Sequence, residues 1–381
     1  MEIAEIHHWL VRAPFSIPVE WGSGTRLGTT RLICRIRTRS GHEGWGETQC
    51  LIDSTPAAFG TAAELVHGWD IRNVEGFHRL ILGAGYYHHQ RAAVYAIAAL
   101  EMAMWDALGR ALGQPLWALW GGKWRDEVRA TGYVFASDPA EARRQLQLHA
   151  DRGHEAFKIK IGMGADSDIA LTEAARQEVG SADIRLDVNG AWTRPTAKRQ
   201  LARLAEFAPN WVEQPLELSD LKGSAELRGQ PIPIVLDEAT YTLSDVSVAL
   251  DAGAMDAALL DPHQAGGLWQ CIKAAALCEA QGVPVGLHSG GELAISQAAY
   301  IHLAACIPNM TIPIDTERAW IGADVSPEPP ALRDGGYAVS DRCGLGVDID
   351  EALVEAIAVD KIEGAYLDAA RPGWFPTKPS Y

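Results

Sequence analysis

The sequence lacks several features that mark particular classes of protein. Its six cysteines include no CxxC pair, so disulfides are not expected to hold the fold together, and reduced thiols favour a cytoplasmic location. The first residues, Met1–Phe15, contain no basic stretch followed by an apolar one, which argues against a secretory signal. Basic residues are few, with 33 Lys and Arg against 49 Asp and Glu. The formal charge of −16 therefore disfavours nucleic acid and anionic membranes as partners.

Long hydrophobic runs without charge are also missing. The most apolar stretch, Ala92–Gly113, contains Glu101, Asp106 and Arg110, which favours a buried helix over a membrane span. The composition, 48% hydrophobic and 22% charged, is typical of a globular protein with a sizeable core. The length of 381 residues allows two or three domains, or one large barrel with additions.

Residues 1–125 mix strand and helix signals, with the strand signal first. Thr29–Arg39 alternates apolar and basic residues, as a strand does. Three helical stretches follow, at Thr55–Gly68, Asn73–Leu82 and Gln90–Gly113. Strands followed by helices predict an α+β domain over residues 1–125.

From about Val128 short apolar runs alternate with helical segments. Helices are expected at Asp138–Gly153, Asp166–Gly180 and Trp269–Gln281. The alternation predicts a parallel sheet, and eight repeats favour a closed (β/α)₈ barrel of the TIM type over residues 126–324. A doubly wound open sheet is the alternative. The eight candidate strands are Val128–Phe135, Ala156–Ile161, Ile184–Val188, Trp211–Glu213, Ile234–Asp237, Ala257–Asp261, Val285–His288 and Thr311–Asp315.

The tail, residues 325–381, loses this βα rhythm and contains Pro327-Glu328-Pro329-Pro330. We expect it to return to the first domain. The fold class predicted is therefore α/β, a barrel with an α+β capping domain made from both ends of the chain.

Ionisable residues stand at the ends of seven of the candidate strands, 24 to 27 residues apart. In a (β/α)₈ barrel the carboxyl ends of all strands face one mouth, so these side chains would converge. An acidic residue after a strand is also a common helix N-cap, but seven in register are hard to explain by capping alone. The seven are Lys160, Asp187, Glu213, Asp237, Asp261, His288 and Asp315.

Lys158 and Lys160 share one face of their strand because side chains alternate along it. In a barrel both would point inward, where neighbouring anions or a metal-bound ligand must neutralise them. Their proximity is expected to lower one pKa toward neutrality, as a general base requires. The alternative is an edge strand whose lysines are solvated.

Asp187, Glu213 and Asp237 end three successive strands, and three neighbouring carboxylates repel unless a hard cation lies between them. Ligation by oxygen alone favours Mg²⁺. Asp261 and His288 end the sixth and seventh strands. A carboxylate bonded to the Nδ1 atom of a histidine fixes its tautomer and leaves Nε2 free for proton transfer.

Together these motifs resemble the enolase superfamily, in particular its mandelate racemase/muconate lactonizing enzyme branch, essentially from end to end. The position of a second lysine in other members holds Asp261 here, which resembles the Lys plus His–Asp type. The sequence segments around Asp261, His288 and Asp315 are similar to those of glucarate dehydratases. Asp237, however, occupies a metal-ligand position where that group tends to have an amide side chain. The motifs are Lys158-Ile-Lys160, Leu186-Asp187-Val-Asn189-Gly, Glu213-Gln-Pro215, Leu236-Asp237-Glu238, Asp261 before Gly266-Gly267, and Gly44-Trp-Gly-Glu47.

The resemblance implies a Mg²⁺-dependent acid-sugar (aldonate or aldarate) dehydratase, a lyase that removes the proton α to a carboxylate and then eliminates water. Lys160 and His288 would transfer protons on opposite faces, Lys158 would add positive charge, and Asn189 would bond a hydroxyl or the leaving group. Without a β-hydroxyl the same groups would act as a racemase or epimerase. A non-catalytic scaffold or ligand binder is the remote alternative.

The first domain is expected to cover the barrel mouth with specificity loops. The loop Val19–Gly28 carries Trp21 and Arg26 as candidate substrate contacts. Arg26 suits a distal carboxylate, but a solvent-exposed loop arginine fits the sequence equally well. Ser289 and Asp315 are further substrate-contact candidates, and the resemblance implies a homo-oligomer.

Overall fold

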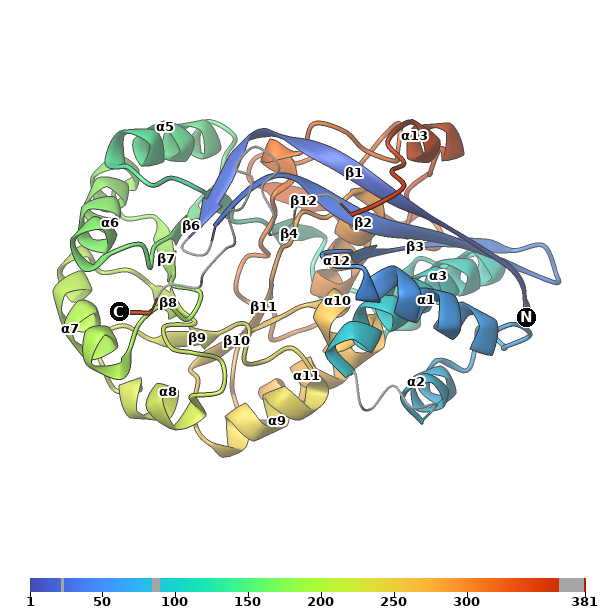
Figure 1. The fold of residues 1–381 in the computed structure, drawn as a ribbon, viewed down its shortest axis with the longest axis horizontal. Helices are drawn as coiled ribbons and strands as arrows, with labels where there is room; N and C mark the ends of the chain where they lie inside the picture. Colours follow the sequence, from blue (N-terminus) through green and yellow to red (C-terminus); the bar gives the residue numbers. More distant parts are fainter. Residues whose placement is uncertain (22–23, 84–89, 363–379) are drawn as a thin grey trace.

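The computed structural model describes residues 1–21, 24–83, 90–362 and 380–381 (Figure 1). The chain begins with an antiparallel sheet in the order β1 (Ile3–Trp21), β2 (Gly24–Thr38) and β3 (Glu43–Gln49). The expected helices follow as α1 (Ser54–Leu65), α2 (Val74–Gly83) and α3 (Gln90–Leu112), and α4 (Leu116–Leu119) ends this part. We call β1–β3 with α1–α3 the cap. None of the described helices is both long and apolar enough to cross a membrane.

The helix α3 packs directly on β3, and two glycines allow this. A Cβ atom at Gly46 would lie 1.9 Å from the backbone oxygen of Ala99, and one at Gly44 would lie 2.1 Å from that of Ala103. Any side chain at either position would push the strand off the helix. The glycines of the Gly44-Trp-Gly-Glu47 motif therefore serve the packing of the cap.

Seven parallel strands form a curled sheet in sequence order, with helices on its outer face (Figure 1). The predicted barrel with a capping domain is confirmed. The strands are β5 (Gly132–Val134), β6 (Ala156–Lys160), β7 (Asp183–Asp187), β8 (Trp211–Glu213), β9 (Ile234–Leu236), β10 (Ala257–Leu260) and β11 (Val285–Leu287). The helices are α5 (Pro139–Ala150), α6 (Ala165–Val179), α7 (Arg194–Leu204), α8 (Leu221–Leu227), α9 (Leu243–Asp251), α10 (Pro262–Ala265), α11 (Leu268–Ala280) and α12 (Ala294–Cys306).

Two of the eight expected strands differ from the prediction. Thr311–Asp315 is not a regular strand, yet it closes the barrel through backbone bonds from Asp315 N to Leu287 O (2.9 Å) and from Thr131 N to Ile314 O (2.8 Å). Val128–Phe135 is divided into β4 (Glu127–Arg129) and β5. It divides because β4 leaves the barrel to pair antiparallel with β12 (Gly336–Ala338).

The expected loop Val19–Gly28 is mostly strand. Val19 pairs with Arg26 in the register of β1 and β2, so Arg26 lies on β2 near the tip of a hairpin. The side chain of Trp21 lies outside the described part of the chain, and the prediction that it contacts substrate is left without a structural outcome.

The chain after residue 325 reaches both parts of the molecule. Beyond α13 (Glu351–Ala356), the backbone bonds from Arg12 N to Ile357 O (2.9 Å) and from Val359 N to Leu10 O (2.8 Å) attach it to β1. Tyr381, in contrast, accepts a bond from Thr193 N at 2.8 Å, so it lies against the loop that follows β7 (Figure 1).

Candidate active site

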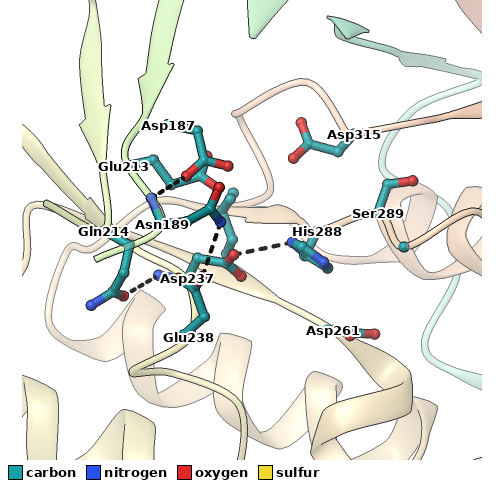
Figure 2. Close-up of polar contacts among 12 residues, drawn as sticks. Asp187, Asn189, Glu213, Gln214, Asp237, Glu238, Asp261, His288, Ser289 and Asp315 are labelled. Carbon is teal, nitrogen blue, oxygen red and sulfur yellow. Dashed lines mark hydrogen bonds and ion pairs between the residues drawn. The ribbon is translucent and has the colours of Figure 1, made fainter. Parts of the chain in front are cut away.

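Strand register brings the predicted residues to one edge of the barrel. Lys160 of β6 pairs with Asp187 of β7, and Asp187 pairs with Glu213 of β8. Asp237 directly follows β9, the next strand in the sheet. The side chains of Asp187, Glu213 and Asp237 are fully buried, and they form an arc of carboxylates across three neighbouring strands (Figure 2).

Both lysines point inward, as predicted for a barrel strand, and both bind carboxylates. Lys160 Nζ lies 2.5 Å from Asp187 Oδ2 and donates to Asn189 Oδ1 at 2.9 Å. Lys158 Nζ donates to Glu213 and, at 2.9 Å, to Asp315 Oδ2. Both ammonium groups also lie near the ring of Tyr133, at 4.8 and 5.3 Å from its centroid. The alternative of solvated lysines on an edge strand is excluded.

The expectation that one lysine has a lowered pKa is wrong in this arrangement. Burial is the largest influence on the pKa of Lys160 and lowers it, but the charges of its neighbours, Asp187 first among them, together outweigh burial, so the pKa of Lys160 is raised. The pKa of Lys158 is likewise raised, because Asp187 and Glu213 outweigh burial. Proximity of the two ammonium groups acts in the predicted direction but is the smaller effect.

The carboxylate arc fits a hard cation. Both oxygens of Asp237 and Oε2 of Glu213 are buried and accept no hydrogen bond among the described residues, although Asp237 Oδ2 forms an ion pair with His288 and Glu213 Oε2 one with Arg185. Burial and the charge of Asp187 raise the pKa of Glu213 to about 8, although Lys158 and Arg185 lie beside it and act in the opposite direction. An all-oxygen donor set of this kind suits Mg²⁺. The group of described residues whose ligand atoms lie within 4.8 Å of one another is Glu213, His288 and Asp315, so of the three predicted ligands it includes Glu213 and not Asp187 or Asp237.

The predicted bond between Asp261 and His288 is not made. Asp261 caps α10 by accepting from His263 N (2.9 Å), and it accepts further bonds from Gln264 Nε2 (2.9 Å) and Tyr300 Oη (2.9 Å). His288 Nδ1 instead lies 3.1 Å from Asp237 Oδ2 (Figure 2). Burial lowers the pKa of His288, but Asp237 outweighs it and raises that pKa to about 9. Asp261 therefore acts as a helix N-cap, the alternative role considered for acidic residues after strands. Its negative charge also raises the pKa of His288.

Asn189 and Gln214 form hydrogen bonds to residues in and next to the carboxylate arc. Asn189 adopts a left-handed backbone (φ 47°) and donates from Nδ2 to Glu238 Oε1 at 3.0 Å. Gln214, also left-handed (φ 36°), accepts from Asp237 N at 3.1 Å and so fixes the position of that carboxylate (Figure 2). Residues other than Gly, Asn and Asp are uncommon at positive φ, so the backbone of Gln214 is strained at this site.

Several site residues were not assigned a role from the sequence. Arg185 lies inside the barrel, 3.0 Å from Glu213 Oε2 and bonded to Asp315. The two-residue period of the strand Ile184–Asp187 places it on the face of Asp187, and this signal could have identified it. Glu238, which follows Asp237 in the chain, is a second such residue: burial and the charge of Asp237 raise its pKa to about 7.

A cavity of about 220 Å³ lies between the barrel mouth and the cap. Lys160, Asn189, Glu238 and His288 line it from the barrel, and Arg26 and Gln49 line it from the cap. Ser289 also lines the cavity, where it donates to Glu292 Oε2 and accepts from Glu317 N at 3.1 Å.

Two candidate substrate contacts have other partners. Asp315 is fully buried, is not among the described residues lining the cavity, and holds Lys158 and Arg185. Arg26 lines the cavity, but its Nη2 atom donates to Glu317 Oε1 at 2.7 Å. The positive charge of Arg26, which was expected to bind a distal carboxylate of the substrate, is already paired with the carboxylate of Glu317.

Family models match nearly the whole described chain. Residues 4–121 match the mandelate racemase/muconate lactonizing enzyme N-terminal domain, and residues 141–353 match the enolase C-terminal domain-like family. A solved structure named as an enolase from Thermobispora bispora, in complex with magnesium and formate, superposes with a TM-score of 0.88 at 27% identity. The match covers 94% of this chain and 92% of that one.

The names of the similar curated proteins describe two kinds of activity, dehydratase and racemase. A probable glucarate dehydratase of Streptomyces coelicolor is 29% identical over 91% of both chains. A D-galactonate dehydratase of Ralstonia nicotianae is 29% identical over 87% of this chain and 93% of its own. An N-succinyl-L-Arg/Lys racemase of Bacillus cereus is 25% identical over 94% of this chain and 98% of its own.

Proposed function

Because the chain belongs to the mandelate racemase/muconate lactonizing enzyme branch of the enolase superfamily, we propose that it is a magnesium-dependent dehydratase of acid sugars. One observation carries the proposal. Lys160 and His288 line the same cavity from β6 and from the end of β11, on either side of the strands that bear the three carboxylates. Two proton-transfer groups flanking a cation site suit removal of an α-proton and departure of a β-hydroxyl.

Asp187, Glu213 and Asp237 would hold the cation. When bound, Mg²⁺ would stabilise the negative charge that develops on a substrate carboxylate as its α-proton leaves. Lys158, held between Glu213 and Asp315, adds a fixed positive charge beside that carboxylate.

With its charge taken up by the cation, Asp187 would no longer raise the pKa of Lys160, which favours the neutral form of the lysine. In that form Lys160 Nζ, oriented by Asn189 Oδ1, removes the α-proton, and the C–H electron pair moves into the carboxylate. That pair then returns to form the carbon–carbon double bond as the β-hydroxyl departs. His288 supplies the proton that lets it leave as water. The resulting enol becomes a 2-keto-3-deoxy acid when it takes up a proton at carbon 3.

A racemase or epimerase is the second candidate. The placement of Lys160 and His288 on opposite sides of the arc equally suits removal of a proton from one face and its return to the other. The relative named N-succinyl-L-Arg/Lys racemase supports this candidate. The outcome depends on whether the substrate carries a hydroxyl β to its carboxylate.

A screen of aldonic and aldaric acids with Mg²⁺, read by formation of 2-keto-3-deoxy product, tests the proposal. We expect product with at least one acid sugar. Exchange of only the α-proton in ²H₂O, on an acid without a β-hydroxyl, would instead establish the racemase. Binding without turnover or exchange, unaltered in Lys160→Met, would identify a ligand-binding barrel.

A further inference from the structure

The two walls of the cavity differ in charge. Arg26, Lys160 and His288 are the basic residues among the described ones lining it, and each faces a carboxylate. Lys160 and His288 face Asp187 and Asp237, which are proposed to hold the cation. Arg26 faces Glu317, which lies outside that arc. A cation would therefore free positive charge on Lys160 and His288 and leave the pair of Arg26 and Glu317 neutral.

Arg26 is fixed where it is. Its guanidinium lies 5.5 Å from the centroid of the Phe15 ring and 2.7 Å from Glu317 Oε1. The arginine side chain is 12% exposed and that of Glu317 is 2% exposed. A salt bridge this far from solvent is not exchanged for a ligand carboxylate without leaving Glu317 uncompensated.

The acidic residues on the same cavity have spare acceptor capacity. Glu317 Oε2 is buried and has no hydrogen-bond partner within the described ranges. Glu238 also lines the cavity, and its Oε2 atom is buried without a hydrogen-bond partner among the described residues, while its other oxygen accepts from Asn189. Buried carboxylate oxygens without partners require O–H or N–H groups, which a polyhydroxylated chain provides.

We infer that the enzyme accepts acid sugars with one carboxylate and a hydroxyl chain, and that Glu317 excludes those with a second carboxylate at the far end. This inference rests on the proposed function and deepens it from acid sugars in general to aldonates. A second carboxylate would meet Glu317 instead of a free arginine, and like charges in a buried site disfavour binding. Glu317 is thus a specificity-determining residue, and Arg26 acts through it.

The test uses pairs of six-carbon acids of the same stereochemistry that differ only at carbon 6: gluconate with glucarate, galactonate with galactarate, and mannonate with mannarate. For each pair, kcat/KM and the dissociation constant by calorimetry are measured on the Mg²⁺-loaded protein. We expect the best aldonate to exceed its aldarate by at least about tenfold in both quantities. An aldarate that binds or reacts as well as its aldonate would overturn the inference and leave the dehydratase assignment intact.

The variant Glu317→Gln removes the negative charge that neutralises Arg26. We expect the ratio of aldonate to aldarate in kcat/KM to fall by about tenfold or more toward the diacid. Glu351→Gln is the matched control, because it removes the carboxylate partner of another cap arginine, Arg35, away from the cavity. The control should leave the ratio unchanged, and an equal shift in both variants would contradict the role of Glu317.

Failure of the proposed function has a different signature. If no acid sugar is converted, the dehydratase assignment fails, and calorimetry still decides the charge preference. Tighter binding of the aldonates would then uphold the selection of one carboxylate. Equal binding, or binding of neither acid of any pair, would overturn it.

Discussion

Two groups of buried charged side chains, one at the junction of cap and barrel and one at the barrel mouth, differ in how completely their polar atoms are paired. At the junction of cap and barrel, Arg31 Nε donates to Glu47 Oε1 at 2.7 Å, and both side chains are fully buried. The remaining Glu47 bonds come from Leu293 N and Ser296 N, each at 2.8 Å, so this cap residue satisfies the N-terminus of α12. Arg31 also bonds Gly290 O and His263 Nε2.

At the barrel mouth the pairing is incomplete. Both oxygens of Asp237 and one each of Glu213, Glu238 and Glu317 are buried without a hydrogen-bond partner in the described part of the chain. Buried polar groups are normally bonded, and exceptions of this density mark places prepared for a ligand. The buried charges at the junction therefore join the cap to the barrel, whereas those at the mouth are available to a cation and a substrate.

The largest expected effect is on turnover. Lys160→Met should lower kcat of the converted substrate by roughly 10³–10⁴-fold, because it removes a proton-transfer group. The fold should survive, because Asp187 keeps Lys158 at 3.0 Å. Steady-state kinetics and circular dichroism provide the measurements. Lys273→Met, at an ion pair with Glu75 outside the cavity, is the control and should keep kcat within about twofold. Turnover retained in Lys160→Met would exclude this lysine as a catalytic residue.

The second prediction concerns stability at the junction. Glu47→Ala should lower the free energy of unfolding by about 3–5 kcal/mol, because it leaves Arg31 buried without its carboxylate and the first turn of α12 without acceptors. Urea denaturation measures it. Glu238→Gln, at the mouth, should change the same quantity by less than about 1 kcal/mol, because one of its oxygens is already unbonded. Equal losses in the two variants would abolish the distinction between the two groups.

Much of the mouth follows from the sequence, because its residues sit at strand ends. Side-chain alternation places Lys158 and Lys160 on one face, and parallel register then sets Lys160, Asp187 and Glu213 side by side. The helices α2, α3, α5, α6 and α11 begin and end close to the expected residues, since hydrophobic periodicity and flanking glycines mark them.

Contacts between distant residues could not be predicted in the same way. Asp261 and His288 are on adjacent strands, but Tyr300, 39 residues further on, and the first turn of α10 take the oxygens of Asp261. Arg26 and Glu317 are 291 residues apart, and no local pattern relates them. The pKa of Lys160 depends on the balance of several charges in space, which spacing along the chain does not contain.

The third prediction uses the cation to separate two acids at the mouth. Saturating wild-type protein with Mg²⁺ at a hundredfold excess over Kd should raise its unfolding free energy by about 2.7 kcal/mol. Asp237→Asn should lose most of this gain, because it removes the charge of a carboxylate that accepts no hydrogen bond in the described part of the chain and forms an ion pair with His288. Asp261→Asn should keep it, because the oxygens of Asp261 already bind α10 and Tyr300. Urea denaturation with and without MgCl₂ measures the gain for each variant. If Asp261→Asn lost the gain and Asp237→Asn kept it, Asp261 and not Asp237 would be a ligand of the cation.

The smallest expected effect is a pH dependence at the junction. His263 Nε2 lies 2.7 Å from Arg31 Nη2, and burial together with the charge of Arg31 holds the pKa of His263 well below its ordinary value of 6.5. A histidine with a lowered folded-state pKa binds its proton in the unfolded chain first, so stability is present above pH 6.5 and is lost as the pH falls below it.

Each pH unit below that value should therefore cost the fold about 1.4 kcal/mol through His263 alone. His263→Gln keeps an acceptor for Arg31 but cannot titrate, so its unfolding free energy should fall less steeply between pH 7 and 5.5. Other buried histidines, such as His149 and His302, contribute equally to both proteins and cancel in the difference. Parallel curves for the two proteins would mean that the junction relaxes to accept a second positive charge, and that its pairing is no more rigid than that of the mouth.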